Sequence, residues 1–92
     1  MDVKDAVKLA KQYVIDLFAE EGIADIGLEE VKFDDLTRNW SITIGFSRSW
    51  DKPQNSFAAL AGHMYPRRSY KVVMISDDNA KVISVKNHEV ES

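Results

Sequence analysis

Two histidines, His63 and His88, are the side chains of this sequence that titrate near neutral pH without help from their surroundings. His63 follows a short apolar run that we expect to form a helical turn, and an imidazolium is favourable at a helix end. His88 starts a polar tail that we expect to fray. Neither histidine is accompanied by a nucleophile elbow or a comparable local signature. We therefore expect no catalytic residue; a small-ligand or enzymatic site that uses His63 is the third and least favoured alternative.

Two pairs of neighbouring carboxylates, Asp34-Asp35 and Asp77-Asp78, are a second candidate for chemistry. Acid–base catalysis would require one carboxyl group of a pair to be buried, so that its pKa rises. Both pairs fall in polar stretches that we expect to form turns, where aspartate is favoured because its side chain accepts backbone hydrogen bonds. No group of His, Asp and Glu residues has the spacing of metal ligands. We therefore expect turns at both pairs, with neither a metal site nor a cofactor.

Aromatic residues and arginines gather in and around the stretch 50–68. Residues of these two types dominate the binding energy of protein interfaces. Two arginines in an acidic chain are a weak sign of nucleic-acid binding, so we expect no nucleic-acid partner. We expect the stretch to contact an unknown protein or peptide partner through Trp50, Tyr65, Arg67 and Arg68. The alternative, equally open at this point, is that the stretch only covers the sheet.

The composition is that of one ordinary globular domain. The chain has 92 residues, of which 45% are hydrophobic and 29% are charged, so residues 1–92 are expected to form a single core. The formal net charge of −3 gives no general attraction to nucleic acids or to anionic membranes. The sequence has no cysteine, no recognisable export signal and no apolar run long enough to span a membrane. We therefore expect a single cytoplasmic domain without a membrane partner.

The stretch 39–48 organises the predicted fold. Large apolar residues at its even positions alternate with small or hydroxylated residues at its odd positions, which indicates a β-strand with one buried face. We expect that buried face to be formed by Trp40, Ile42, Ile44 and Phe46. Gly45 lies in the middle of this strand and indicates a bulge or a bend.

The remaining periodic segments complete the domain. Apolar residues recur every three or four positions over 2–21, which predicts an amphipathic helix that begins at Asp2 and ends before Gly22. After a connection at 23–27, alternating patterns predict three further strands, and a tight turn with positive φ at Asn79 joins the last two. These strands are expected at 28–34, 69–76 and 81–87. The predicted fold class is therefore α+β: one N-terminal helix packed on a curled four-stranded antiparallel sheet of the cystatin-like kind.

The outer face of the predicted sheet carries little charge. Its residues on the central strand are small, and we place two aliphatic residues of the next strand beside them. A surface with low charge and aliphatic cover is typically buried by another chain, most simply by a second copy. We therefore expect a homodimer face formed by Ser41, Thr43, Val73 and Ile75. The alternative is that the stretch 50–68 folds back over this face, so the oligomeric state stays open.

Four segments of the chain resemble the core pattern of the small PepSY-type domains: DAVKLA (5–10), WSITI (40–44), YKVVMI (70–75) and KVISV (81–85). Domains of this family are mostly extracytoplasmic and have been thought to restrain peptidases. The resemblance implies a module with an inhibitory or regulatory role. We therefore expect a non-catalytic protein- or peptide-binding module, and the alternative is a structural subunit that self-associates through its open sheet face.

Overall fold

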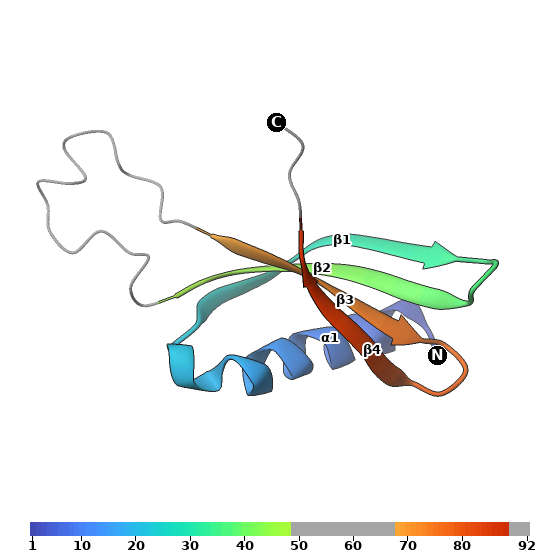
Figure 1. Cartoon of the computed structure of the whole chain (residues 1–92), viewed down its shortest axis with the longest axis horizontal. Coiled ribbons are helices and arrows are strands. Elements are labelled where there is room, and N and C mark those ends of the chain that lie inside the picture. Colours follow the sequence, from blue (N-terminus) through green and yellow to red (C-terminus); the bar gives the residue numbers. More distant parts are fainter. Residues whose placement is uncertain (49–67, 89–92) are drawn as a thin grey trace, which may run out of the picture.

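The computed structural model of the protein describes residues 1–48 and 68–88. One helix lies across one face of a four-stranded sheet, and within the described residues the other face carries no helix or strand (Figure 1). The predicted α+β fold, with one helix on a four-stranded antiparallel sheet, is therefore confirmed. Four residues of the sequence predictions lie outside the described residues: Trp50, His63, Tyr65 and Arg67.

The helix α1 (Val3–Leu17) begins after Asp2, whose carboxylate accepts a hydrogen bond from the Asp5 N–H at 2.8 Å. Its buried residues recur every four positions along one face and are Ala6, Ala10 and Val14. The α-helix ends before the predicted residue 21, and a 3₁₀ turn, η1 (Ala19–Glu21), continues the chain to Gly22. Gly22 stops the helical segment because its φ of 63° lies in the left-handed region that glycine adopts without strain.

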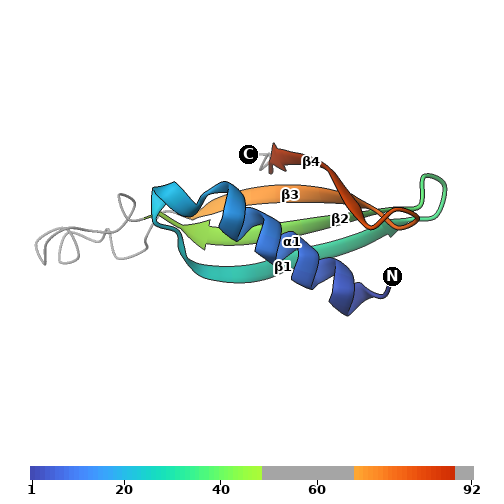
Figure 2. The same ribbon diagram turned by 90° about the horizontal axis from the view of Figure 1, so that it is seen from below.

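The sheet consists of β1 (Ala24–Asp34), β2 (Asn39–Ser47), β3 (Ser69–Ser76) and β4 (Lys81–Asn87). The strands lie side by side in this order, and every neighbouring pair is antiparallel. β1 and β4 are therefore the edge strands. Figure 2 shows that α1 crosses the sheet obliquely, over β1, β2 and β3.

β1 starts at Ala24, so the connection predicted at 23–27 is wrong. The ladder between β1 and β2 shifts register twice within residues 24–30, as it does at β-bulges. Each shift breaks the alternation of inward and outward side chains, and for this reason the sequence pattern becomes regular only from Leu28 onward. β2 keeps its register through Gly45, so the irregularity that was expected at this glycine lies in the partner strand.

The core lies between α1 and the face of β2 that the sequence predicts. Ile42, Ile44 and Phe46 are fully buried. Trp40 continues the same face and is half-buried against Phe33, with 4.8 Å between the ring centroids. The predicted facing of β2 is therefore confirmed.

The facing that was predicted for β3 is wrong. Val73 lies opposite the buried Ile42, and residues directly opposite each other share a face of the sheet. Val73 and Ile75 are consequently fully buried on the helix side, not placed beside Ser41 and Thr43 on the outer face. Because β3 has aliphatic side chains at both odd and even positions, its own pattern does not select a face. The pairing with β2 selects it.

Both hairpin turns place a left-handed residue in their last position. This residue is Arg38 (φ 58°) between β1 and β2, and it is Ala80 (φ 53°), not the predicted Asn79, between β3 and β4. The Arg38 N–H donates to the Asp34 carbonyl at 2.7 Å, and the Ala80 N–H donates to the Ser76 carbonyl at 2.8 Å. The geometry of the turn, not the type of residue, therefore decides which position takes a positive φ.

Candidate functional site

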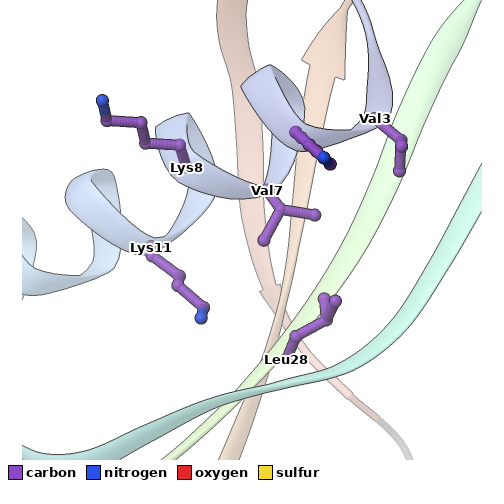
Figure 3. Close-up of a pocket in the computed structure, with 6 residues that line it drawn as sticks. Val3, Val7, Lys8, Lys11 and Leu28 are labelled. Carbon is purple, nitrogen blue, oxygen red and sulfur yellow. The ribbon is translucent and has the colours of Figure 1, made fainter.

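A groove lies between the first half of α1 and the edge strand β1 (Figure 3). We name it the α1–β1 groove. Its volume is about 440 Å³, and its lining residues are Val3, Lys4, Val7, Lys8, Lys11 and Leu28. In Figure 3, Val7 and Lys11 extend from α1 toward the strand layer in which Leu28 lies. The groove is therefore formed by side chains of α1 and of the edge strand β1, which follows α1 in the chain after the 3₁₀ turn η1.

The walls of the α1–β1 groove are apolar and accessible. Val3 is 45% exposed and Leu28 is 43% exposed, although both belong to regular elements. Leu28 lies opposite Ile44 in the ladder, so it shares the face of the sheet that forms the core. No described element covers Leu28 from outside, because β1 is an edge strand and α1 passes it obliquely. The apolar surface of the core therefore reaches the outside of the molecule at this point.

Three ammonium groups accompany this apolar surface. Lys4, Lys8 and Lys11 are separated by four and three residues, which places them along one stripe of α1. Within the described part of the chain, none of these lysines takes part in an ion pair. A positive stripe is therefore available to anionic groups of a partner, in a chain whose formal net charge is −3.

The outer face of the sheet differs in part from the predicted dimer face. Thr43 lies opposite Val72, and Ser41 lies opposite Met74. We name these four residues the outer strip. Val72 and Met74 are half-buried and Thr43 is only 7% exposed. Two residues of the predicted dimer face, Ser41 and Thr43, therefore lie on the outer strip. The other two, Val73 and Ile75, belong to the core.

A smaller hollow of about 310 Å³ adjoins the outer strip and is lined by Glu29, Glu30, Thr43, Tyr70 and His88. His88 does not fray as predicted, since its N–H donates to the Tyr70 carbonyl at 3.0 Å and its ring lies 6.4 Å from the Tyr70 ring. Arg68 and Lys32 pair with the two carboxylates of the hollow, at 3.8 Å and 3.0 Å. The charges of this hollow are thus already paired, which makes it a weaker candidate for a binding site than the α1–β1 groove.

Arg68 is the member of the predicted partner-binding group that the structure describes. Its Nη2 donates to the Asp25 carbonyl at 2.9 Å and lies 3.8 Å from the Glu29 carboxylate. Gly45 makes room for this arrangement, because a Cβ at this position would lie 2.9 Å from Glu29 Oε1 and 3.0 Å from Arg68 Nη2. Arg68 therefore connects the chain just before β3 to β1 across the outer face of the sheet. Its contact with a partner stays a prediction.

Asp77 makes more contacts than a turn residue needs. Trp40 Nε1 donates to its Oδ1 at 3.0 Å, and Arg38 Nη2 lies 3.2 Å from its Oδ2. The hydrogen bond from Trp40 lowers the pKa of the Asp77 carboxyl group below its ordinary value, and the charges of the N-terminal ammonium group and of Arg38 act in the same direction. Asp34 has a local role, because its Oδ1 accepts hydrogen bonds from the backbone of its own turn. The Leu36 N–H donates to it at 2.9 Å. Asp77 therefore ties the two hairpins together and has a structural role.

The α1–β1 groove was not predicted from the sequence. Lysines at helical spacing are ordinary on a solvated helix face, so they do not by themselves indicate a site. Val3 and Val7 carry no separate signal either, because they continue the apolar stripe of α1 that contains the buried Ala10 and Val14. That Val3 is 45% exposed follows from where α1 lies on the sheet, which the stripe does not reveal.

Within residues 1–48 and 68–88, no group of three or more His, Cys, Asp or Glu residues is placed to hold a metal ion. No helix of the described chain has the length and hydrophobicity needed to cross a membrane. Comparisons with family models, with curated proteins and with solved structures found no match to this chain. The resemblance to PepSY-type domains therefore stays a prediction from the sequence.

Proposed function

We propose that the protein is a non-catalytic module that binds a protein or peptide partner at the α1–β1 groove. The observation that carries this proposal is one concave surface that combines exposed apolar side chains with three lysines outside the described ion pairs. Its lining offers aliphatic contacts and positive charge but no nucleophile beside a general base, which favours recognition over catalysis. An inhibitory or regulatory role, which the resemblance implies, belongs to the same proposal. A cytoplasmic location, which is expected from the composition without cysteine, belongs to it as well.

The accessible parts of Val3 and Leu28 give a partner apolar surface to bury. Full burial of one aliphatic side chain contributes about 1.5–3 kcal/mol, and these two side chains belong to residues that are 45% and 43% exposed. Covering both therefore contributes about 1.5–2.5 kcal/mol. Association costs more than this in lost translational and rotational freedom. A partner consequently needs further contacts, and the lysine stripe beside these side chains offers them to anionic groups.

Site-specific photo-crosslinking in the source cell tests the proposal. A photoreactive amino acid replaces Leu28 in the groove and, in a control protein, Leu36, which is 95% exposed in the turn between β1 and β2. We expect a discrete crosslinked partner from position 28 but not from position 36. The crosslink should disappear when Val3→Glu is added, because a carboxylate then replaces part of the apolar wall. Equal yields from the two positions, or no crosslinked partner at position 28, would contradict the proposal.

Self-association through the outer strip is a second candidate function. It is favoured by the uncharged side chains of the outer strip, in which Thr43 lies opposite Val72 and Ser41 lies opposite Met74. Sedimentation velocity at micromolar concentration should then detect a dimer, and Val72→Lys should shift the protein to a monomer. A monomer at every concentration of the wild-type protein would remove this candidate.

A further inference from the structure

We propose further that the occupant of the α1–β1 groove is an acidic amphipathic helix of the partner, which lies alongside α1 over the first half of β1. This inference rests on the proposed function, because it names the class of partner that the groove takes. Three properties of the described residues lead to it. They are the incomplete cover of the sheet, the bulged edge of β1 and the lysine stripe of α1.

α1 is too narrow to cover its side of the sheet alone. Neighbouring strands lie about 4.8 Å apart, so a four-stranded sheet is roughly 19 Å wide, whereas a helix with its side chains is about 10 Å wide. Figure 2 shows that α1 runs obliquely, so that the first half of β1 emerges on one side of it. Leu28 lies in this uncovered half and on the helix side of the sheet. A second helix beside α1 therefore fits the space over the first half of β1.

Addition of an extended segment to β1 is the main alternative, and the bulges of β1 oppose it. The ladder shifts register twice within residues 24–30, and Asp25 has a φ of 54°. Bulges interrupt the regular row of backbone donors and acceptors that an added strand requires. The groove offers side chains from α1 and Leu28 instead, and an apolar groove lined by side chains is the usual receptor of an amphipathic helix.

The lysine stripe selects an acidic occupant. Lys4, Lys8 and Lys11 extend over about 10 Å of α1, at the helical rise of about 1.5 Å per residue. Carboxylates at positions i, i+4 and i+7 of a neighbouring helix have the same spacing as the three lysines. Lys11 extends toward the strand layer, whereas Lys8 extends away from it, so that Lys8 offers its charge at the outer rim of the groove (Figure 3). A second copy of this chain does not fit the groove with its own helix, because two α1 helices packed about a two-fold axis bring their lysine stripes together.

Titration of the isotope-labelled protein with synthetic peptides of about 18 residues tests this inference. A helix of this length is longer than the part of α1 that carries the lysine stripe. The acidic peptide carries a leucine stripe flanked by glutamates at i, i+4 and i+7. One control peptide has lysine in place of each glutamate, a second has the same acidic composition in scrambled order, and a third has two central prolines. We expect the acidic peptide to shift the amide resonances of the first half of α1 and of the residues around Leu28. The three control peptides should bind at least about tenfold more weakly.

Matched variants of the protein separate the groove from its overall charge. Lys4→Glu with Lys8→Glu reverses two charges in the groove, and Lys81→Glu with Lys86→Glu reverses two on β4, at the opposite edge of the sheet. We expect the groove variant to bind the acidic peptide about tenfold more weakly or worse, and the β4 variant to change the affinity less than about twofold. Equal losses in the two variants would overturn the inference, because the attraction would then come from net charge.

Other outcomes of the titration identify which part of the inference is wrong. Equal binding of the lysine peptide overturns the acidic partner, and equal binding of the proline peptide overturns the helix. Failure of the acidic peptide, combined with lysine-dependent binding to vesicles of phosphatidylglycerol, overturns the inference in favour of an anionic membrane surface. Crosslinking at position 28 distinguishes failure of the acidic-helix inference from failure of the proposed function. A crosslinked partner without binding of the acidic peptide refutes the acidic helix alone, whereas the absence of any partner at position 28 refutes both.

Discussion

Val72 and Val73 are neighbours on β3 that have the same side chain and face opposite sides of the sheet. Val73 is fully buried on the helix side, and Val72 is half-buried on the outer strip. Replacing either residue with alanine removes the same two carbon atoms and lowers β-strand propensity by a similar amount. The difference between the two variants therefore measures the difference in burial.

The expected magnitudes follow from this difference. Val73→Ala removes two buried carbons, which loses about 1.6 kcal/mol of transfer free energy at about 0.8 kcal/mol each. The cavity left behind adds to this loss, so the free energy of unfolding should fall by about 2–3 kcal/mol. Val72→Ala removes carbons that are only partly buried and leaves no enclosed cavity. Its free energy of unfolding should fall by about 0.5–1 kcal/mol.

Urea unfolding followed by far-ultraviolet circular dichroism measures both variants. With a slope of about 1 kcal/mol per molar urea for a small domain, the midpoint should fall by about 2–3 M for Val73→Ala and by at most about 1 M for Val72→Ala. The measurement is made at a concentration where sedimentation shows a monomer, so that a contact between copies at Val72 does not contribute. Equal midpoints, or a larger loss for Val72→Ala, would refute the facing that the pairing with β2 assigns to β3.

Three further variants test other contacts. Because the pKa of Asp77 is lowered, its carboxylate stabilises the fold above the unfolded-state pKa of 3.8, and this contribution is lost as the pH falls through the lower folded-state pKa. Thermal unfolding measured from about pH 5 down to about pH 2 should therefore show a smaller loss of stability for Asp77→Asn than for the wild type, and identical pH profiles would contradict this role. Gly22→Ala places a Cβ at a φ of 63° and should lower the free energy of unfolding in urea by about 1–2 kcal/mol; an unchanged midpoint would exclude the left-handed conformation. Lys4→Glu puts an anion in place of a cation in the first turn of α1 and should raise the free energy of unfolding by about 0.3–1 kcal/mol, whereas a decrease would show that the lysine stabilises the free protein.

The sequence predicts the facing of β2 but not that of β3, and the reason is visible in the side chains. β2 has large apolar residues such as Ile42 and Ile44 on one face and Ser41 and Thr43 on the other, so only one orientation buries the apolar set. β3 has aliphatic residues at successive positions, and both orientations bury a comparable amount of surface. Its facing is fixed by register with β2, a long-range property that no local pattern contains.

The start of β1 and the left-handed residue of the second turn were missed for a related reason. Bulges within residues 24–30 shift the ladder, so the alternation on which the strand prediction depends is absent there. In the turn between β3 and β4 the backbone hydrogen bond from Ala80 to Ser76 sets the geometry, and it overrides the general preference of Asn79 for a positive φ. In both places pairing between strands decides the local conformation.

The predicted and the observed candidate sites differ because they depend on different kinds of information. The residues around 50–68 were selected by type, and most of that stretch lies outside the described residues, so partner binding by Trp50, Tyr65 and Arg67 stays a prediction. The α1–β1 groove depends on position: Leu28 is accessible because β1 is an edge strand and because α1 crosses it obliquely. Neither property follows from the amphipathic pattern of α1 or from the strand pattern of β1.

The α1–β1 groove also gathers residues that folding alone does not favour. A cation at Lys4 opposes the positive end of the dipole of α1, and the like charges of Lys4, Lys8 and Lys11 repel one another along the helix. Leu28, 43% exposed, leaves apolar surface in contact with water. An acidic residue at position 4 or a polar residue at position 28 would relieve these costs without disturbing the core. These departures from the most stable free protein meet at one surface, and the acidic amphipathic helix that we propose as its partner would turn each of them into a favourable contact.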